Sequence, residues 1–176
     1  MIVLGLSGAV SHDASAALFI DGELIAAAEE ERFIRDKHAK GKLPYEAARF
    51  CLTFAGIKPD QVDIVAFPYA QIPLTSPARW HYAKRYWYAP DRAIMALLNG
   101  NRRYWRNYRG VMQLLDDLDI DSRRVRFLPV EHHLAHASSA YHLSGFKEKC
   151  AIIGIDGKGE YATTFFGYGE SGKRHK

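Results

Sequence analysis

The chain has 176 residues, of which 48% are hydrophobic and 25% are charged, and its formal net charge is +4. These values are close to the average of soluble globular domains, so they exclude a disordered, collagen-like or disulfide-scaffold protein. A chain of this length forms one domain or a piece of a larger one. The N-terminus lacks the basic region and cleavage pattern of a secretory signal, and no apolar run reaches the ~18 residues that cross a bilayer. We therefore expect a cytoplasmic protein without a membrane segment.

The N-terminal residues predict three strands. Residues 2–7 form a short apolar run, and the runs 16–20 and 24–28 flank Asp21-Gly22, which is a strong signal for a β-hairpin. The sequence therefore predicts a β-meander, with a loop of small residues between its first two strands.

A charged stretch then leads to a helix and a buried strand. Residues 29–42 are rich in charged side chains, and such a run is normally a solvated face. The next helix is predicted to begin near Pro44 and to end before Gly56, because its apolar residues recur at helical spacing between these two signals. Residues 62–67, which Pro68 terminates, are predicted to be a buried strand.

Residues 75–118 predict a helical insertion whose composition differs from the rest of the chain. Asn99-Gly100-Asn101 separates two helices, 91–98 and 102–118. Between Arg79 and Arg109 lie eight basic residues, one acidic residue and eight of the 22 aromatic residues. Arginine clustered with tryptophan and tyrosine is typical of phosphate contact and base stacking. The same pattern also fits helices that bury their aromatic rings and extend their arginines to water.

The remaining residues predict a strand at 125–130, a helix at 131–143, and strands at 150–155 and 161–168. The mixture of hairpin strands and strand–helix crossovers favours an α/β fold with a mixed sheet and flanking helices over a uniform Rossmann sheet. The polar tail 170–176 follows a strand directly, where a complete domain would usually continue. We therefore expect the chain to be a fragment of a longer one.

Two histidines lie four residues apart at the start of the predicted helix 131–143. This spacing places His132 and His136 on one helical face, about one turn apart, which is the geometry that two ligands of one metal ion need. The residue after His132 is His133, so the pattern is not HExxH and does not indicate a metalloprotease. Hydrogen-bonded histidines at a helix start are the other interpretation.

A glycine-containing turn follows the predicted strand 150–155. Asp156 at the strand end is a candidate for a third metal ligand, and Gly157 and Gly159 allow the phosphate of a cofactor to approach the backbone closely. The same composition is also that of an ordinary hairpin turn.

The loop 7–15 carries an adjacent histidine and aspartate. Its small residues expose backbone N–H groups that can hold an anion. His12 can act as a base near neutral pH, and Asp13 can fix its tautomer. A plain strand-to-strand turn is the alternative.

A resemblance to a known family rests on four segments in this order: GLSGAVSHDASAAL, AAAEEERFIRDKH, VEHHLAHASSAY and IDGKGE. Together they resemble the N-terminal region of the O-carbamoyltransferases of the nodulation and antibiotic-tailoring type. The resemblance spans residues 2 to about 168. It implies that residues 1–176 form an actin-like ATPase lobe of the ribonuclease-H-like class, related to the tRNA threonylcarbamoyladenosine transferases.

The resemblance also implies site residues and cofactors. His132, His136 and Asp156 correspond to ligands of a divalent metal, typically iron, with a further aspartate ligand beyond Lys176. His12 corresponds to a histidine that helps to deprotonate the acceptor hydroxyl, and Asp13 accompanies it. A domain outside this chain would make carbamoyl adenylate from carbamoyl phosphate and ATP.

The leading hypothesis is therefore the N-terminal part of an O-carbamoyltransferase that acts on a small molecule with a hydroxyl group and is inactive by itself. The alternative is a nucleic-acid-binding module that uses residues 79–109, and we favour it less. A kinase or scaffold role is the third hypothesis, but sugar kinases have no need of the HHLAH motif. Association of several copies of the chain stays open.

Overall fold

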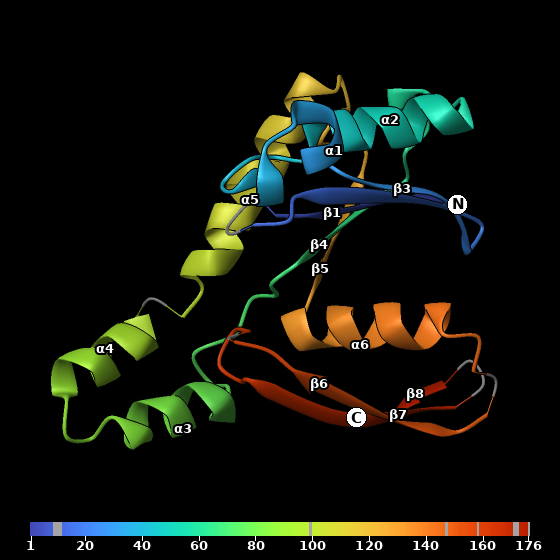
Figure 1. The fold of residues 1–176 in the computed structure, drawn as a ribbon. Helices are drawn as coiled ribbons and strands as arrows, with labels where there is room; N and C mark the ends of the chain where they lie inside the picture. The colour runs from blue at the N-terminus through green and yellow to red at the C-terminus, as the bar shows by residue number, and fades with distance from the viewer. Residues whose placement is uncertain (9–11, 99, 147, 158, 171–172, 176) are drawn as a thin grey trace. The chain divides into compact units, whose positions relative to one another are not determined.

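The computed structural model describes residues 1–8, 12–98, 100–146, 148–157, 159–170 and 173–175. The chain divides into two compact units (Figure 1). The first consists of Met1–Pro68 and Arg103–Pro129, and the second consists of Tyr69–Arg102 and Val130–Lys176.

The first unit is built on a five-stranded sheet of order β3-β2-β1-β4-β5. Strand β1 pairs antiparallel with β2 and parallel with β4, and β2 pairs antiparallel with β3. The predicted meander and the predicted α/β class, a mixed sheet with flanking helices, are thereby confirmed. The strands are β1 (Ile2–Ser7), β2 (Ser15–Ile20), β3 (Glu23–Glu29), β4 (Ile64–Pro68) and β5 (Arg126–Val130).

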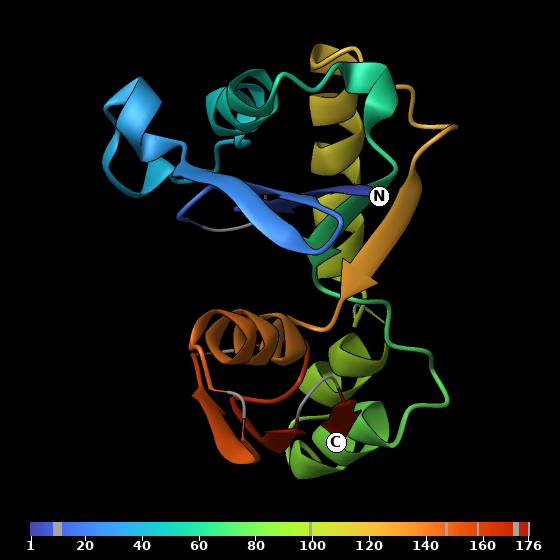
Figure 2. The ribbon, with the colours of Figure 1, turned by 90° about the vertical axis from the view of Figure 1, so that its right-hand side faces the viewer.

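Helices α2 (Tyr45–Ala55) and α5 (Arg102–Asp117) complete the core of the first unit. Helix α2 packs on the hairpin of β2 and β3, as Figure 2 shows. Gly56, with φ of +66°, ends this helix in the left-handed conformation that glycine adopts without strain. The central side chains of the core come from the sheet, α2 and α5: Leu4, Leu18, Val65, Cys51, Leu114 and Leu115.

The charged stretch 29–42 is only partly a solvated face. It contains α1 (Glu31–Ile34) and a short 3-10 helix (Lys37–Ala39), and a second 3-10 helix lies at Pro59–Gln61. Glu30 is 3% exposed, so the expectation of a solvated side chain is wrong there. Its carboxylate accepts the backbone N–H groups of Glu46 at 3.2 Å and Ala47 at 2.8 Å. A distant residue thus caps the first turn of α2.

Replacing Glu30 by alanine is expected to lower the free energy of unfolding by ~1–3 kcal/mol, because two backbone N–H groups of α2 lose their acceptor. Urea unfolding measures this change. Glu29→Ala is the matched control, since that side chain is exposed and should change stability by no more than ~0.5 kcal/mol. Equal effects of the two substitutions would contradict the capping role.

The second unit contains a three-stranded sheet of order β6-β7-β8, in which β7 pairs antiparallel with both neighbours. Its elements are α3 (Pro77–Arg85), α4 (Pro90–Leu98), α6 (His132–Leu143), β6 (Cys150–Ile155), β7 (Thr164–Glu170) and β8 (Lys173–His175). Two details differ from the sequence-based expectation. Part of the polar tail forms β8. In addition, β7 begins at Thr164 and not at residue 161, because the chain first closes a turn in which the Gly159 N–H donates to the Ala162 carbonyl at 2.9 Å.

The helical segment expected at 75–118 is divided between the units. Helices α3 and α4 belong to the second unit, whereas α5 buries Val111, Leu114 and Leu115 in the core of the first. Of the predicted separator between α4 and α5, Asn99 lies outside the described residues. Among the residues that the structure describes, no helix has the length and apolar character needed to span a bilayer.

Candidate functional site

The predicted metal ligands converge in the second unit. His132 and His136 lie on α6, and Asp156 follows β6. The Nε2 atom of His132 lies 2.6 Å from Oδ2 of Asp156. The Nε2 atom of His136 lies 3.2 Å from Nε2 of His132 and 4.0 Å from the same carboxylate oxygen. One ligand atom from each side chain thus lies within 4.8 Å of the other two.

These donors fit a divalent transition metal. Imidazole nitrogens and a carboxylate oxygen are ligands that iron and zinc accept. Bonds of ~2.1 Å to a tetrahedral ion place neighbouring ligand atoms roughly 3.4 Å apart, and the three separations found here, 2.6, 3.2 and 4.0 Å, lie on both sides of this value. Moreover, the facing Nε2 atoms of His132 and His136 can share only one proton, whereas a cation accepts a lone pair from each.

The electrostatics favour the forms that bind a metal. The hydrogen bond with His132 lowers the pKa of Asp156, and the N–H of Gly157, which donates to Oδ1 at 2.6 Å, lowers it further. Burial lowers the pKa of His136, and the nearby His132 adds to this effect. Asp156 is therefore ionised and His136 neutral near neutral pH, as metal ligands must be.

The two glycines of the following turn have different surroundings. A Cβ atom at Gly157 would meet nothing within 4 Å. A Cβ atom at Gly159 would overlap the ring of His133, which is 2% exposed and packs against this turn. Lys158 lies outside the described residues. Gly159 thus permits the packing of His133, and a cofactor role for the two glycines stays a prediction.

The predicted histidine–aspartate pair lies in the first unit, and a second histidine joins it. Nδ1 of His12 lies 2.5 Å from Oδ2 of Asp13, and Nδ1 of His38 lies 2.9 Å from Oδ1. The hydrogen bond from His38 lowers the pKa of Asp13, and the bond from His12 adds to the effect. An ionised Asp13 that holds Nδ1–H of His12 leaves Nε2 of His12 able to accept a proton. Residues 9–11 of the predicted anion-holding loop lie outside the described residues.

Three residues near these groups received no role from the sequence. His38 lies in the charged run, where it looked like part of a solvated surface. Glu160 ends the IDGKGE segment and accepts backbone N–H bonds from Ala70 and His132. Tyr69 stacks on the ring of His132, and no sequence signal marks it.

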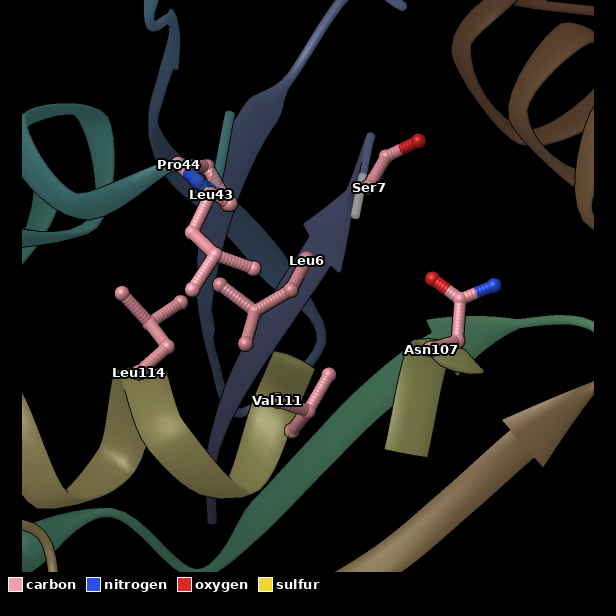
Figure 3. Close-up of a pocket in the computed structure, with 7 residues that line it drawn as sticks. All are labelled: Leu6, Ser7, Leu43, Pro44, Asn107, Val111 and Leu114. Carbon is pink, nitrogen blue, oxygen red and sulfur yellow. The ribbon is translucent and has the colours of Figure 1, made fainter. Parts of the chain in front are cut away.

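A pocket also lies in the first unit (Figure 3). Among its lining side chains, only those of Ser7 and Asn107 are polar, and none is titratable, so we assign it no function. Figure 3 shows its leucines pointing toward one another. The lining residues are Leu6, Ser7, Leu43, Pro44, Asn107, Val111 and Leu114.

The basic aromatic segment 79–109 has buried and exposed parts. Arg79 is 3% exposed, and its Nη1 donates to the Leu97 carbonyl at 2.8 Å, so this arginine does not face a solvent-borne phosphate. Trp87 and Tyr88 are exposed, at 82% and 65%. The nucleic-acid hypothesis thus retains exposed rings but loses Arg79 as a phosphate contact.

Two known proteins are similar to this chain along most of its length. Nodulation protein NolNO of Sinorhizobium fredii is 34% identical over 185 residues, which cover 96% of this chain and 25% of that protein. The protein sll1178 of Synechocystis sp. is 33% identical over 168 residues, which cover 92% of this chain and 26% of that protein. The chain thus spans about a quarter of the length of these relatives.

Among solved structures, YeaZ from Pseudomonas aeruginosa is similar with a TM-score of 0.42 and 18% identity, over 97% of this chain and 62% of that one. The Ppx/GppA phosphatase of Aquifex aeolicus has a TM-score of 0.41 and 10% identity, over 100% of this chain and 50% of that one. Similarities this distant carry no argument about activity.

The family itself is shown by sequence. The carbamoyltransferase N-terminus model matches residues 2–176. This match includes all four segments on which the resemblance rested. Because it extends over nearly the whole chain, the protein belongs to the carbamoyltransferase N-terminus family.

Proposed function

We propose that this chain is the N-terminal part of an O-carbamoyltransferase and that it activates the acceptor hydroxyl. The convergence of His132, His136 and Asp156 in a chain of this family carries the proposal. The carbamoyl donor is carbamoyl adenylate, which a part of the enzyme outside these 176 residues makes from carbamoyl phosphate and ATP. Relatives about four times as long have room for such a part. A cytoplasmic location, where ATP is available, is part of this proposal.

His12 is the proposed base. The acceptor oxygen attacks the carbamoyl carbon, its proton passes to Nε2 of His12, and AMP leaves with the electrons of the broken C–O bond. Asp13 holds Nδ1–H of His12 and stabilises the imidazolium that forms. His38 bonds the second oxygen of the same carboxylate and so holds Asp13 in place.

His132, His136 and Asp156 are the residues that would hold the divalent metal, with iron as the proposed ion. When bound, such an ion supplies Lewis-acid polarisation of an oxygen atom. The chain itself contributes two imidazole lone pairs and one negative charge, and ligands from elsewhere can complete the coordination. A Cβ atom at Gly157 would meet nothing within 4 Å, which supports the approach of a nucleotide phosphate beside Asp156, and Gly159 remains the second proposed contact although the ring of His133 packs against it.

The 176-residue chain alone is expected to consume neither ATP nor carbamoyl phosphate above the buffer rate, because the adenylate-forming part is absent from it. The complete enzyme is expected to consume both and to add 43 mass units, roughly one carbamoyl group in place of hydrogen, to a hydroxyl compound. Phosphate release and mass spectrometry over a panel of sugar and alcohol acceptors measure these outcomes. Turnover by the chain alone would refute the assignment of adenylate formation to a part of the enzyme outside these 176 residues. Adenylate formation by the complete enzyme without any transfer to a hydroxyl would refute the proposed function.

A further inference from the structure

His132 lacks the second hydrogen bond that usually orients a metal-binding histidine. Such a histidine normally donates its second ring N–H to a carboxylate, a carbonyl or water, which fixes the plane of the ring. Nδ1 of His132 is buried and has no hydrogen-bond partner among the described residues. Its Nε2 nevertheless faces Asp156 at 2.6 Å. Other contacts must therefore fix this ring.

Tyr69 makes the first of these contacts. Its ring lies parallel to the imidazole of His132, with the ring centroids 4.6 Å apart and the planes inclined by 14°. The rings of His133 and His136 meet His132 nearly at right angles. Tyr69 is 6% exposed, so its ring is shielded from solvent. The flat stack thus restricts rotation of the His132 ring out of its plane.

The backbone of Tyr69 gives independent support for this role. Its φ angle is +73°, in the left-handed region that favours glycine and strains a bulky residue. Such a conformation persists only where the surroundings over-determine it, and strain of this kind gathers at functional sites. A tyrosine at a position suited to glycine indicates that the side chain is needed there.

Glu160 holds the backbone of the same histidine. The side chain of the N-cap residue Glu131 makes no capping hydrogen bond to α6. Instead, Oε1 of Glu160 accepts the N–H of His132 at 3.0 Å and the N–H of Ala70 at 3.0 Å, and Oε2 lies 3.3 Å from the same His132 nitrogen. The carboxylate of Glu160 thus links Ala70, which follows Tyr69, to His132, the first residue of α6. Glu160 itself lies in the connection that carries Asp156.

We propose that Tyr69 and Glu160 are positioning residues of the metal centre. Tyr69 sets the plane of the His132 ring, and Glu160 sets the place of its backbone, so that Nε2 points toward Asp156 and His136. Neither residue binds the ion. The inference rests on the proposed metal centre and extends it to two side chains that hold one ligand.

Zinc binding to the 176-residue chain tests this inference by calorimetry. Tyr69→Leu and Glu160→Ala are each expected to weaken zinc binding ~10- to 100-fold, as loss of a group that orients a ligand does. Tyr69→Phe keeps the ring, and Glu160→Gln keeps an oxygen that can accept both N–H bonds, so both should bind nearly as tightly as wild type. Tyr82→Leu is the matched control, because Tyr82 is an aromatic residue of the same unit whose ring contacts the rings of Tyr86 and Tyr161.

A second measurement needs no metal. The ring current of Tyr69 should shift the NMR signals of the His132 ring protons upfield, and Tyr69→Leu should remove this shift while Tyr69→Phe retains it. If Tyr69→Leu fails to fold, Tyr69→Gly replaces it, because glycine adopts a φ of +73° without strain and carries no ring. Tyr69→Gly should show the same loss of zinc affinity and of the upfield shift.

The outcomes separate this inference from the proposed metal centre. Zinc binding that His136→Ala abolishes but that Tyr69→Leu, Tyr69→Gly and Glu160→Ala leave intact would overturn the positioning role and leave the centre standing. Equal loss in Tyr82→Leu would also overturn it, since the effect would then be general to the unit. A wild-type chain that binds no zinc would overturn both.

Discussion

The double substitution His132→Ala, His136→Ala is expected to abolish binding of ferrous iron or zinc to the 176-residue chain. Two of the three converging donor atoms come from these rings, and Asp156 alone does not form a site. Removing ligands should cost more than removing the groups that orient them, so we expect affinity to fall by more than ~100-fold. Calorimetry, under anaerobic conditions for iron, measures the loss.

His142→Ala is the matched control, because His142 lies on the same helix in its last turn and is exposed. It should bind metal like the wild type. The same heat for wild type and the double variant would show that the converging donors bind no ion.

The pH dependence of this binding has a defined sign. Protons compete with the metal for imidazole, so affinity should fall as the pH decreases. Burial and the nearby His132 lower the pKa of His136, so its lone pair stays available at lower pH than that of an ordinary histidine, with its pKa of ~6.5. The lowered pKa of Asp156 keeps the carboxylate ionised throughout this range. Calorimetry repeated at several pH values should therefore show affinity that falls toward acid pH, with the lone pair of His136 lost only below the ordinary imidazole range.

Local signals account for the parts of the fold that the sequence predicted well. Asp21 and Gly22 both take positive φ angles in the hairpin turn, as the Asp-Gly signal requires. Pro44 and Gly56 bracket α2 as expected. Helical spacing shows which face of α5 is buried but not what covers it. The contribution of α5 to the core of the first unit therefore had no sequence signature.

Some features of the candidate site were likewise predictable from local sequence signals, and others were not. The i, i+4 spacing of His132 and His136 fixes their common face locally, whereas the approach of Asp156 depends on the pairing of distant elements and was expected chiefly from the resemblance. Glu30 and Glu160 each cap a helix far away in the sequence. Charged residues of this kind look like surface residues until the chain is folded. The strained backbone of Tyr69 likewise has no mark in the sequence.

His12→Asn in the complete enzyme is expected to slow carbamoyl transfer by ~10²- to 10⁴-fold, the range typical of a lost acid–base group. Asparagine can still donate an amide N–H to Asp13, which preserves the bond that His12 makes at 2.5 Å. It offers no basic nitrogen in place of Nε2, so only proton removal from the acceptor is lost. Adenylate formation should continue at the wild-type rate, because that chemistry belongs to another part of the enzyme.

A purely structural histidine would behave differently. Loss of a hydrogen bond in an exposed turn should lower stability by about 1 kcal/mol and affect both half-reactions together. The decisive measurement assays adenylate formation and carbamoyl transfer separately on a variant shown by circular dichroism to be folded, with His142→Asn as the control histidine. Equal loss in both half-reactions, or no loss in either, would remove His12 from the mechanism. A loss confined to transfer would leave proton abstraction at Nε2 as the step that the substitution removes, since His38 still holds Asp13 through its other oxygen.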